Sequence, residues 1–125
     1  MNSVLDASAL LALLHNEKGA DKVEAAILNY ALISTVNWTE VVQKAVAKNI
    51  NVDDLHNELV ELGLSFYSFD LSQAYVAGCL WVQTKEFGLS LGDRACLALA
   101  IHLGLPVLTA DTIWNIVDPK KQTVV

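Results

Sequence analysis

The chain has 125 residues, of which 54% are hydrophobic, and a formal net charge of −6 from 8 basic and 14 acidic residues. The apolar fraction excludes an intrinsically disordered chain, and the length predicts a single domain over residues 1–125. The acidic balance excludes broad, non-specific adhesion to nucleic acid, because such adhesion normally requires a basic surface.

Turn-forming residues cut the chain into short apolar runs, which predict strands, and amphipathic runs, which predict helices. The expected strands are 1–6, 31–34, 65–69, 107–109 and 122–125. The expected helices are 7–15, 20–29, 35–49, 51–62, 70–87 and 90–103, with a short turn or helix around Trp114. This alternation predicts an α/β fold with a mostly parallel sheet covered by helices on both faces.

We expect a cytoplasmic protein with no membrane partner. The longest uncharged runs, such as 95–110, are too short to span a bilayer. Met1 is followed at once by a strand-like segment, which is not the pattern of a signal peptide. Cys79 and Cys96 lie in apolar helical stretches and are expected to be buried free thiols.

Four acidic residues fall at corresponding places in the alternation. Asp6 and Asp111 each follow an expected strand, and Glu40 and Asp93 lie near the starts of expected helices. In an α/β sheet, ligands bind beyond the carboxyl ends of the strands, next to the helix starts. We therefore expect the four carboxylates to converge on one spot.

The two acids that follow strands also have a structural interpretation. Asp6 precedes a helix and could simply cap it by accepting a hydrogen bond from an amide of the first turn. Asp111 could cap the short turn ahead of Trp114. Taken alone, each acid leaves this alternative open.

The two acids on helices have similar alternatives. Glu40 could form a capping box with Asn37 or an exposed pair with Lys44, one turn further on. Asp93 could form a capping box with Ser90. Only the shared location of the four acids favours a functional site over four independent caps.

Clustered carboxylates indicate a bound cation. Two of them about 5 Å apart repel by roughly 3 kcal/mol at an effective dielectric constant of 20. Carboxylate oxygens suit Mg²⁺ or Mn²⁺, and pairs of such ions are typical of enzymes that hydrolyse phosphodiesters. Lys44, Lys48 and Arg94 would then hold phosphate groups nearby, unless they are ordinary solvated side chains. The pattern predicts a metal-dependent nuclease that binds nucleic acid locally.

Other chemistries find little support in the sequence. There is no glycine-rich phosphate-binding motif and no nucleophile elbow. His15, His56 and His102 are widely separated and lack the spacing of a zinc site.

Three segments carry a resemblance to a known family. The opening run Val4-Leu5-Asp6-Ala7-Ser8-Ala9-Leu10-Leu11 resembles the start of a PIN domain. Ser90-Leu91-Gly92-Asp93-Arg94-Ala95-Cys96-Leu97-Ala98-Leu99-Ala100 resembles the central acidic helix of that family. Leu108-Thr109-Ala110-Asp111 followed by Trp114 resembles its last acidic motif, and Glu40 stands where the family places its second acid. At this length the chain most resembles the VapC toxins of VapBC toxin–antitoxin pairs.

The resemblance implies a three-layer α/β/α fold and an endoribonuclease that depends on Mg²⁺ or Mn²⁺. It implies that Asp6, Glu40, Asp93 and Asp111 hold the metal, with Ser8 and Thr109 as supporting hydrogen-bond partners. It also implies an RNA substrate, a homodimer and a cognate VapB-type antitoxin that covers the groove.

Two rival functions fit the sequence less well. A non-catalytic protein-binding module of the same fold would gain nothing from clustered anions. A phosphoacceptor domain would need adjacent acids after the first strand, and Asp6 has no acidic neighbour.

Overall fold

Five parallel strands form the centre of the computed structural model, which describes residues 2–111 and 122–124. The strands are β1 (Val4–Leu5), β2 (Leu32–Ser34), β3 (Ser65–Tyr67), β4 (Val107–Thr109) and β5 (Gln122–Val124). Their order in the sheet is β3-β2-β1-β4-β5, and every neighbouring pair is parallel. The predicted mostly parallel sheet is confirmed.

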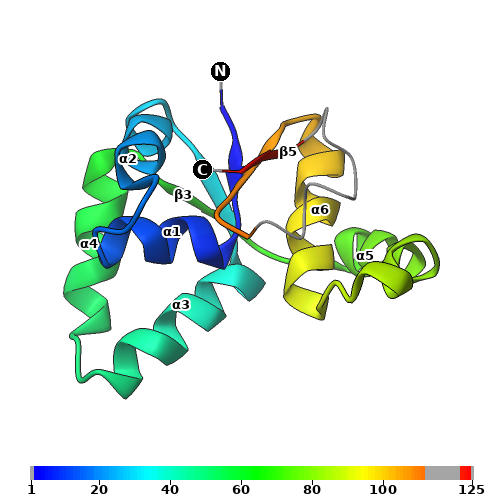
Figure 1. The fold of residues 1–125 in the computed structure, drawn as a ribbon, viewed down its shortest axis with the longest axis horizontal. Coiled ribbons are helices and arrows are strands. Elements are labelled where there is room, and N and C mark those ends of the chain that lie inside the picture. Colours follow the sequence, from blue (N-terminus) through cyan, green and yellow to red (C-terminus); the bar gives the residue numbers. More distant parts are fainter. Residues whose placement is uncertain (1, 112–121, 125) are drawn as a thin grey trace.

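Helices cover both faces of the sheet, as the alternation predicted. They are α1 (Ala7–Leu14), α2 (Ala20–Leu28), α3 (Thr35–Ala47), α4 (Val52–Leu62), α5 (Leu71–Thr84) and α6 (Leu91–Leu103). Figure 1 shows α1, α2 and α4 on one side of the strands, with α5 and α6 on the other. The fold is therefore the three-layer α/β/α arrangement that the resemblance implied.

Side chains that alternate along the strands pack into two hydrophobic clusters, one on each face of the sheet. Leu5 and Leu108 pack into a cluster with side chains of α1, α2, α3 and α4. Val4 and Val107, their neighbours in the chain, pack into a second cluster with side chains of α6. Successive strand residues point to opposite faces, so even the two-residue strand β1 needs an apolar residue at both positions.

Several expected boundaries shift by a few residues. The expected helix 70–87 ends as α5 at Thr84, and a short 3₁₀ helix, η1 (Lys85–Phe87), completes it. The expected strand 65–69 ends at Tyr67, and α3 ends at Ala47 instead of Asn49. The expected turn around Trp114 lies outside the described residues.

Gly63, at the end of α4, is a position that only glycine fits. Its φ is 122°, and an added Cβ would meet the carbonyl oxygen of Ile27 at 2.6 Å. The turn into β3 therefore brings the backbones of α4 and α2 into direct contact.

The expectation that both cysteines are buried is wrong for one of them. Cys96 is fully buried under the sheet, whereas Cys79 is exposed on α5. The reason is that α5 is apolar on its outer side as well as its inner side, so hydropathy alone could not orient it. In the part of the chain that the structure describes, no helix is long and apolar enough to cross a bilayer.

Candidate active site

The strand order reverses between β1 and β4, because the chain builds outward from β1 to β3 and then returns to the other side of β1. Such a switch point opens a crevice at the carboxyl ends of the strands. A pocket of about 230 Å³ lies there, and its lining includes Asp6, Glu40, Asp93 and Asp111. The structure thus brings all four sequence-predicted acids to one pocket, which we call the acid pocket.

Asp6 is both the cap of α1 and a wall of the acid pocket. Its Oδ1 accepts hydrogen bonds from Ala9 N at 2.9 Å and Ser8 Oγ at 2.8 Å, and its Oδ2 accepts one from Thr109 Oγ1 at 2.5 Å. Only 3% of the residue is exposed. Burial raises the pKa of Asp6 to about 6, although the three hydrogen bonds oppose that rise. The capping interpretation was correct and does not exclude a functional one.

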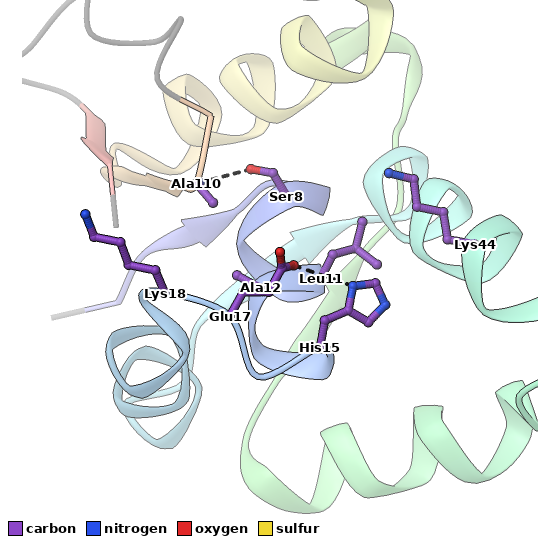
Figure 2. A pocket seen from close by; sticks show the side chains of 8 residues that line it. All are labelled: Ser8, Leu11, Ala12, His15, Glu17, Lys18, Lys44 and Ala110. Atoms are coloured by element: carbon purple, nitrogen blue, oxygen red, sulfur yellow. Dashed lines mark hydrogen bonds and ion pairs between the residues drawn. The ribbon is translucent and has the colours of Figure 1, made fainter. Parts of the chain in front are cut away.

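Ser8 and Thr109 fasten the end of β4 to the start of α1. Ser8 Oγ donates to Asp6 and accepts a hydrogen bond from Ala110 N at 2.9 Å (Figure 2). Thr109 Oγ1 donates to Asp6 and accepts one from Asp111 N at 3.0 Å. Each hydroxyl thus uses its single proton on the carboxylate and a lone pair on the backbone. This pairing fixes the positions of Asp6 and of the Asp111 backbone together.

Glu40 lies in the second turn of α3, and the cap of that helix is Ser34, whose side chain accepts a hydrogen bond from Val36 N. The alternative capping box with Asn37 therefore does not form. Burial and the nearby charge of Asp93 raise the pKa of Glu40, while Lys44 lowers it. The charge of Asp93, on α6, therefore acts on the carboxylate of Glu40, on α3.

Asp93 and Ser90 form the capping box that the sequence allowed. Asp93 Oδ2 accepts a hydrogen bond from Ser90 N at 2.9 Å, and Ser90 Oγ accepts one from Asp93 N at 3.1 Å. The charge of Asp93 also contributes to the raised pKa values of Asp6 and Glu40. Asp93 is thus a cap whose charge still acts on the acid pocket. Asp111 is exposed and lines the acid pocket.

Asn37 also lines the acid pocket, and we did not predict it from the sequence. Its Nδ2 donates to Gly92 O of α6 at 3.0 Å and lies 3.5 Å from Glu40 Oε1. Asn37 is 1% exposed, and its buried Oδ1 has no hydrogen-bond partner among the residues that the structure describes. The available signal was its position at the head of a buried row that continues with Val41 and Ala45.

Gly92 lies directly against the carboxylate of Glu40. A Cβ built there would collide with Glu40 Oε1. The absence of a side chain at Gly92, together with the hydrogen bond from Asn37, lets α3 and α6 approach closely enough for their acids to share a pocket.

The three basic residues of the prediction occupy different surroundings. Lys44 lines the acid pocket, one helical turn after Glu40. Lys48 Nζ lies 3.2 Å from His15 Nε2. Arg94 turns away from the pocket, because its Nη1 donates to Ala77 O of α5 at 2.9 Å. The structure therefore brings Lys44 to the acids and does not bring Arg94 there.

The donor chemistry of the acid pocket suits a hard divalent cation, since carboxylate oxygens dominate it. Within residues 2–111 and 122–124, no three His, Cys, Asp or Glu side chains are grouped closely enough to hold one ion together. Mg²⁺ commonly keeps several waters and uses only one or two carboxylates, so this spacing is compatible with it. Burial, and to a smaller extent the charge of Asp93, raises the pKa of Asp6 and of Glu40, so the charged forms of both carboxylates are disfavoured here.

Comparison with known proteins gives one family match. The sequence model described as the PIN domain matches residues 3–119 of the chain. No curated protein matches the chain in sequence.

Solved structures of similar fold come from toxin–antitoxin complexes. A DNA-bound VapBC from Salmonella typhimurium is 15% identical, with a TM-score of 0.74 and coverage of 99% of this chain and 98% of that one. A toxin–antitoxin complex from Klebsiella pneumoniae is 21% identical, with a TM-score of 0.69 and coverage of 89% and 88%. VapBC2 from Rickettsia felis, bound to a promoter DNA fragment, is 16% identical, with a TM-score of 0.69 and coverage of 99% and 98%. At these identities, the likeness shows the fold alone.

Proposed function

The chain belongs to the PIN domain family, and from that premise we propose that it is a divalent-metal-dependent endoribonuclease and the toxin of a toxin–antitoxin pair. The observation that carries the proposal is the set of four acids lining one pocket at the switch point of the sheet. The toxin–antitoxin complexes that share the fold support the second part of the proposal.

Asp6, Glu40, Asp93 and Asp111 would hold Mg²⁺ or Mn²⁺ in the acid pocket. The chemistry that such an ion supplies in nucleases is electrostatic stabilisation of the negative charge that develops on the phosphate. Ser8 and Thr109 serve this site indirectly, because their hydrogen bonds fix both oxygens of Asp6. Asn37 supports Glu40, because its Nδ2 lies near Glu40 Oε1 and donates a hydrogen bond to Gly92 O, which links α3 to α6.

The substrate contact is assigned to Lys44. Its side chain lines the acid pocket and is the cation whose charge lowers the pKa of Glu40. An ammonium group beside the acids can bind an oxygen of the phosphate to be cleaved and hold it against their repulsion. Lys48, the residue that follows α3, would contact the RNA backbone away from the scissile bond.

A homodimer and a cognate antitoxin complete the proposal. On α5, Leu71, Tyr75 and Val82 are 75%, 70% and 68% exposed, and their spacing places them along one side of the helix. Apolar surface of this kind marks protein contacts, which supports a dimer through α5. A VapB-type antitoxin would then cover the acid pocket.

The first test is RNA 5′-end mapping in cells after induction of this chain without any partner, wild type against Asp93→Asn. Asparagine keeps an oxygen that can accept the hydrogen bond from Ser90 N, so the cap survives while the charge is lost. New ends with wild type alone are expected. New ends with both proteins would remove Asp93 from the proposed site.

A second candidate, a non-catalytic protein-binding module, is favoured by the exposed apolar side chains on α5, because such a surface marks a protein contact whether or not the acid pocket binds an ion. Titration calorimetry with Mg²⁺ and Mn²⁺ separates the two functions. A nuclease site binds the ion, and the heat of binding disappears in Asp6→Asn, whereas a module gives no heat with either protein.

A further inference from the structure

A second pocket, of about 460 Å³, adjoins the acid pocket and shares Ser8, Leu11 and Lys44 with it. Its other lining residues include His15, Glu17 and Lys18. Its volume is within the range of about 300–1,000 Å³ that is typical of small-ligand sites. Figure 2 shows Lys18 and Lys44 at opposite ends of this pocket, with His15 and Glu17 between them. We call it the lysine pocket.

The charge of the lysine pocket is opposite to that of the acid pocket and of the whole chain. Lys18 and Lys44 line it, and Lys48 reaches its His15. Among the described residues that line it, Glu17 alone carries a carboxylate. Three of the chain's eight basic residues thus gather at one pocket of a protein whose net charge is −6.

Two flanking groups hold the imidazole of His15 in place. Lys48 Nζ, which can only donate a hydrogen bond, lies 3.2 Å from Nε2. Nδ1 in turn lies 3.5 Å from Glu17 Oε1. Glu17 is therefore directed at His15, and among the described residues no carboxylate lies within salt-bridge distance of Lys18 or Lys44.

We propose that the lysine pocket is a nucleotide-binding subsite for the residue of a single-stranded RNA that adjoins the scissile phosphate, and this proposal rests on the function proposed above. Lys44, which lines both pockets, binds the scissile phosphate, and Lys18, at the other end of the lysine pocket, binds the next phosphate of the backbone, as lysines do in protein–nucleic acid contacts. The sugar and base lie against Leu11 and Ala12, beside the ring of His15, because unstacked RNA bases pack on aromatic side chains. The shared wall of Ser8, Leu11 and Lys44 makes the two pockets one continuous path for a strand.

The test measures binding without cleavage, so that it does not depend on nuclease activity. The protein carries Asp93→Asn throughout, in the presence of Mg²⁺. The probe is a fluorescein-labelled oligouridylate of about 12 nucleotides, within the usual site size for single strands. Fluorescence anisotropy gives the affinity between about 50 and 200 mM salt. Lys18→Gln is the informative variant, because Lys18 lines the lysine pocket alone, whereas Lys44 lines both pockets.

Lys22→Gln is the matched control. It is also exposed, makes the same change in net charge and does not line the lysine pocket. Loss of one phosphate contact on a single strand lowers the slope of log affinity against log salt by about 0.7, and weakens binding about fivefold near 0.1 M salt. We expect these effects from Lys18→Gln and not from Lys22→Gln. Equal effects from both would overturn the subsite, since they would report only the overall charge.

Cross-linking gives the second readout. A 4-thiouridine in the probe is expected to cross-link on illumination to the peptide that contains His15 and Lys18. Cross-links that all fall outside this peptide would overturn the subsite. It would also be overturned if Lys18→Gln weakened binding of an acidic partner protein and left binding of the RNA probe unchanged. A wild-type chain that cleaves nothing, with Lys18-dependent binding retained, would end the nuclease proposal and leave the nucleotide subsite standing.

Discussion

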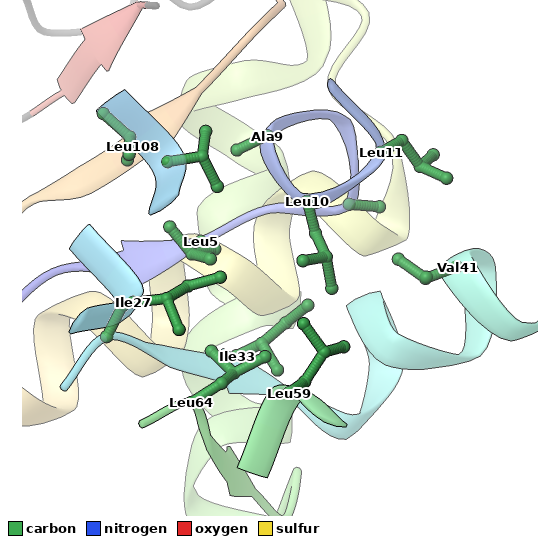
Figure 3. Packing of buried hydrophobic residues seen from close by; sticks show 13 residues of the cluster. Leu5, Ala9, Leu10, Leu11, Ile27, Ile33, Val41, Leu59, Leu64 and Leu108 are labelled. Carbon is green, nitrogen blue, oxygen red and sulfur yellow. The ribbon is translucent and has the colours of Figure 1, made fainter. Parts of the chain in front are cut away.

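Two consecutive residues, Leu5 and Asp6, belong to regions built on opposite physical principles. Leu5 is fully buried in the hydrophobic cluster drawn in Figure 3, where side chains of the sheet pack against those of α1, α2, α3 and α4. Asp6 is nearly as buried, at 3% exposed, but its pKa is raised to about 6 because burial penalises its charge. The core is stabilised by burial, and the acid pocket is destabilised by it.

Burial therefore raises the free energy of unfolding in the core and lowers it in the acid pocket. In the core, every apolar group removed from water contributes about 25 cal/mol per Å². In the acid pocket, buried carboxylates cost free energy until a cation or a proton neutralises them. Substitutions in the two regions should therefore shift stability in opposite directions.

The largest effect is expected from Leu10→Ala in the core. Leu10 is 0% exposed and packs within the cluster of Figure 3, so its truncation leaves a cavity. We expect a loss of about 2–5 kcal/mol in the free energy of unfolding, measured by urea denaturation. The control Val46→Ala, on the exposed side of α3, should change it by less than about 0.5 kcal/mol. A comparable loss from both would contradict the assignment of the core.

The second effect has the opposite sign and depends on pH. In EDTA, Asp6→Asn should be more stable than wild type by roughly 3 kcal/mol above pH 6, because the folded-state pKa is raised from 3.8 to about 6. A raised pKa means that the folded wild type binds the proton more tightly than the unfolded chain does. The stability of wild type therefore falls as pH rises from about 4 to about 6, and the two proteins should converge near pH 4.

Thermal unfolding in EDTA and in Mg²⁺ across this pH range checks the prediction. Mg²⁺ should stabilise wild type and have little effect on Asp6→Asn, because an ion that binds only the folded state raises its stability. The asparagine can keep the local hydrogen bonds, with its oxygen toward Ala9 N and its amide toward Thr109 Oγ1. A variant less stable than wild type at pH 7 in EDTA would show that hydrogen bonding, and not charge, dominates at Asp6.

The sequence predicted the fold and the four acids for the same reason. The strands are short and mostly apolar, and glycine, proline or a capping residue marks most helix ends. The alternation of strands and helices could therefore be predicted without knowledge of tertiary contacts. Acids after strands and at helix starts then fell at the carboxyl edge of the sheet. Their roles as metal ligands remain predictions, because the sequence pattern and the pocket lining indicate proximity and not binding.

The contacts made by individual side chains could not be predicted in this way. Arg94 is adjacent to Asp93 in sequence, but successive residues on a helix point about 100° apart, so Arg94 reaches α5 and not the acids. Asn37 looked like a cap, and only the approach of Gly92 from a distant helix shows that it links α3 to α6. Lys18 is placed at its pocket by the loop before α2, and the conformation of that loop could not be predicted from the sequence.

The smallest effect comes from a matched pair of glycines and tests whether geometry in the acid pocket can be changed without changing the core. Both Gly78 in α5 and Gly92 in α6 are helical, and alanine is favoured over glycine in a helix by about 1 kcal/mol. A Cβ at Gly78 meets nothing within 4 Å, so Gly78→Ala should gain that amount. A Cβ at Gly92 collides with Glu40 Oε1 at the end of a movable side chain. Gly92→Ala should therefore gain less than Gly78→Ala and displace Glu40.

Displacement of Glu40 should appear in function more than in stability. We expect Gly92→Ala to lower RNA cleavage and Mg²⁺ affinity while its melting temperature stays close to that of wild type, and we expect Gly78→Ala to leave both activities unchanged. Full cleavage by Gly92→Ala would show that Glu40 can move without consequence and is not a ligand. A large loss of stability in Gly92→Ala would show that the contact between α3 and α6 is part of the hydrophobic core. The core and the acid pocket would then not be separable where these two helices meet.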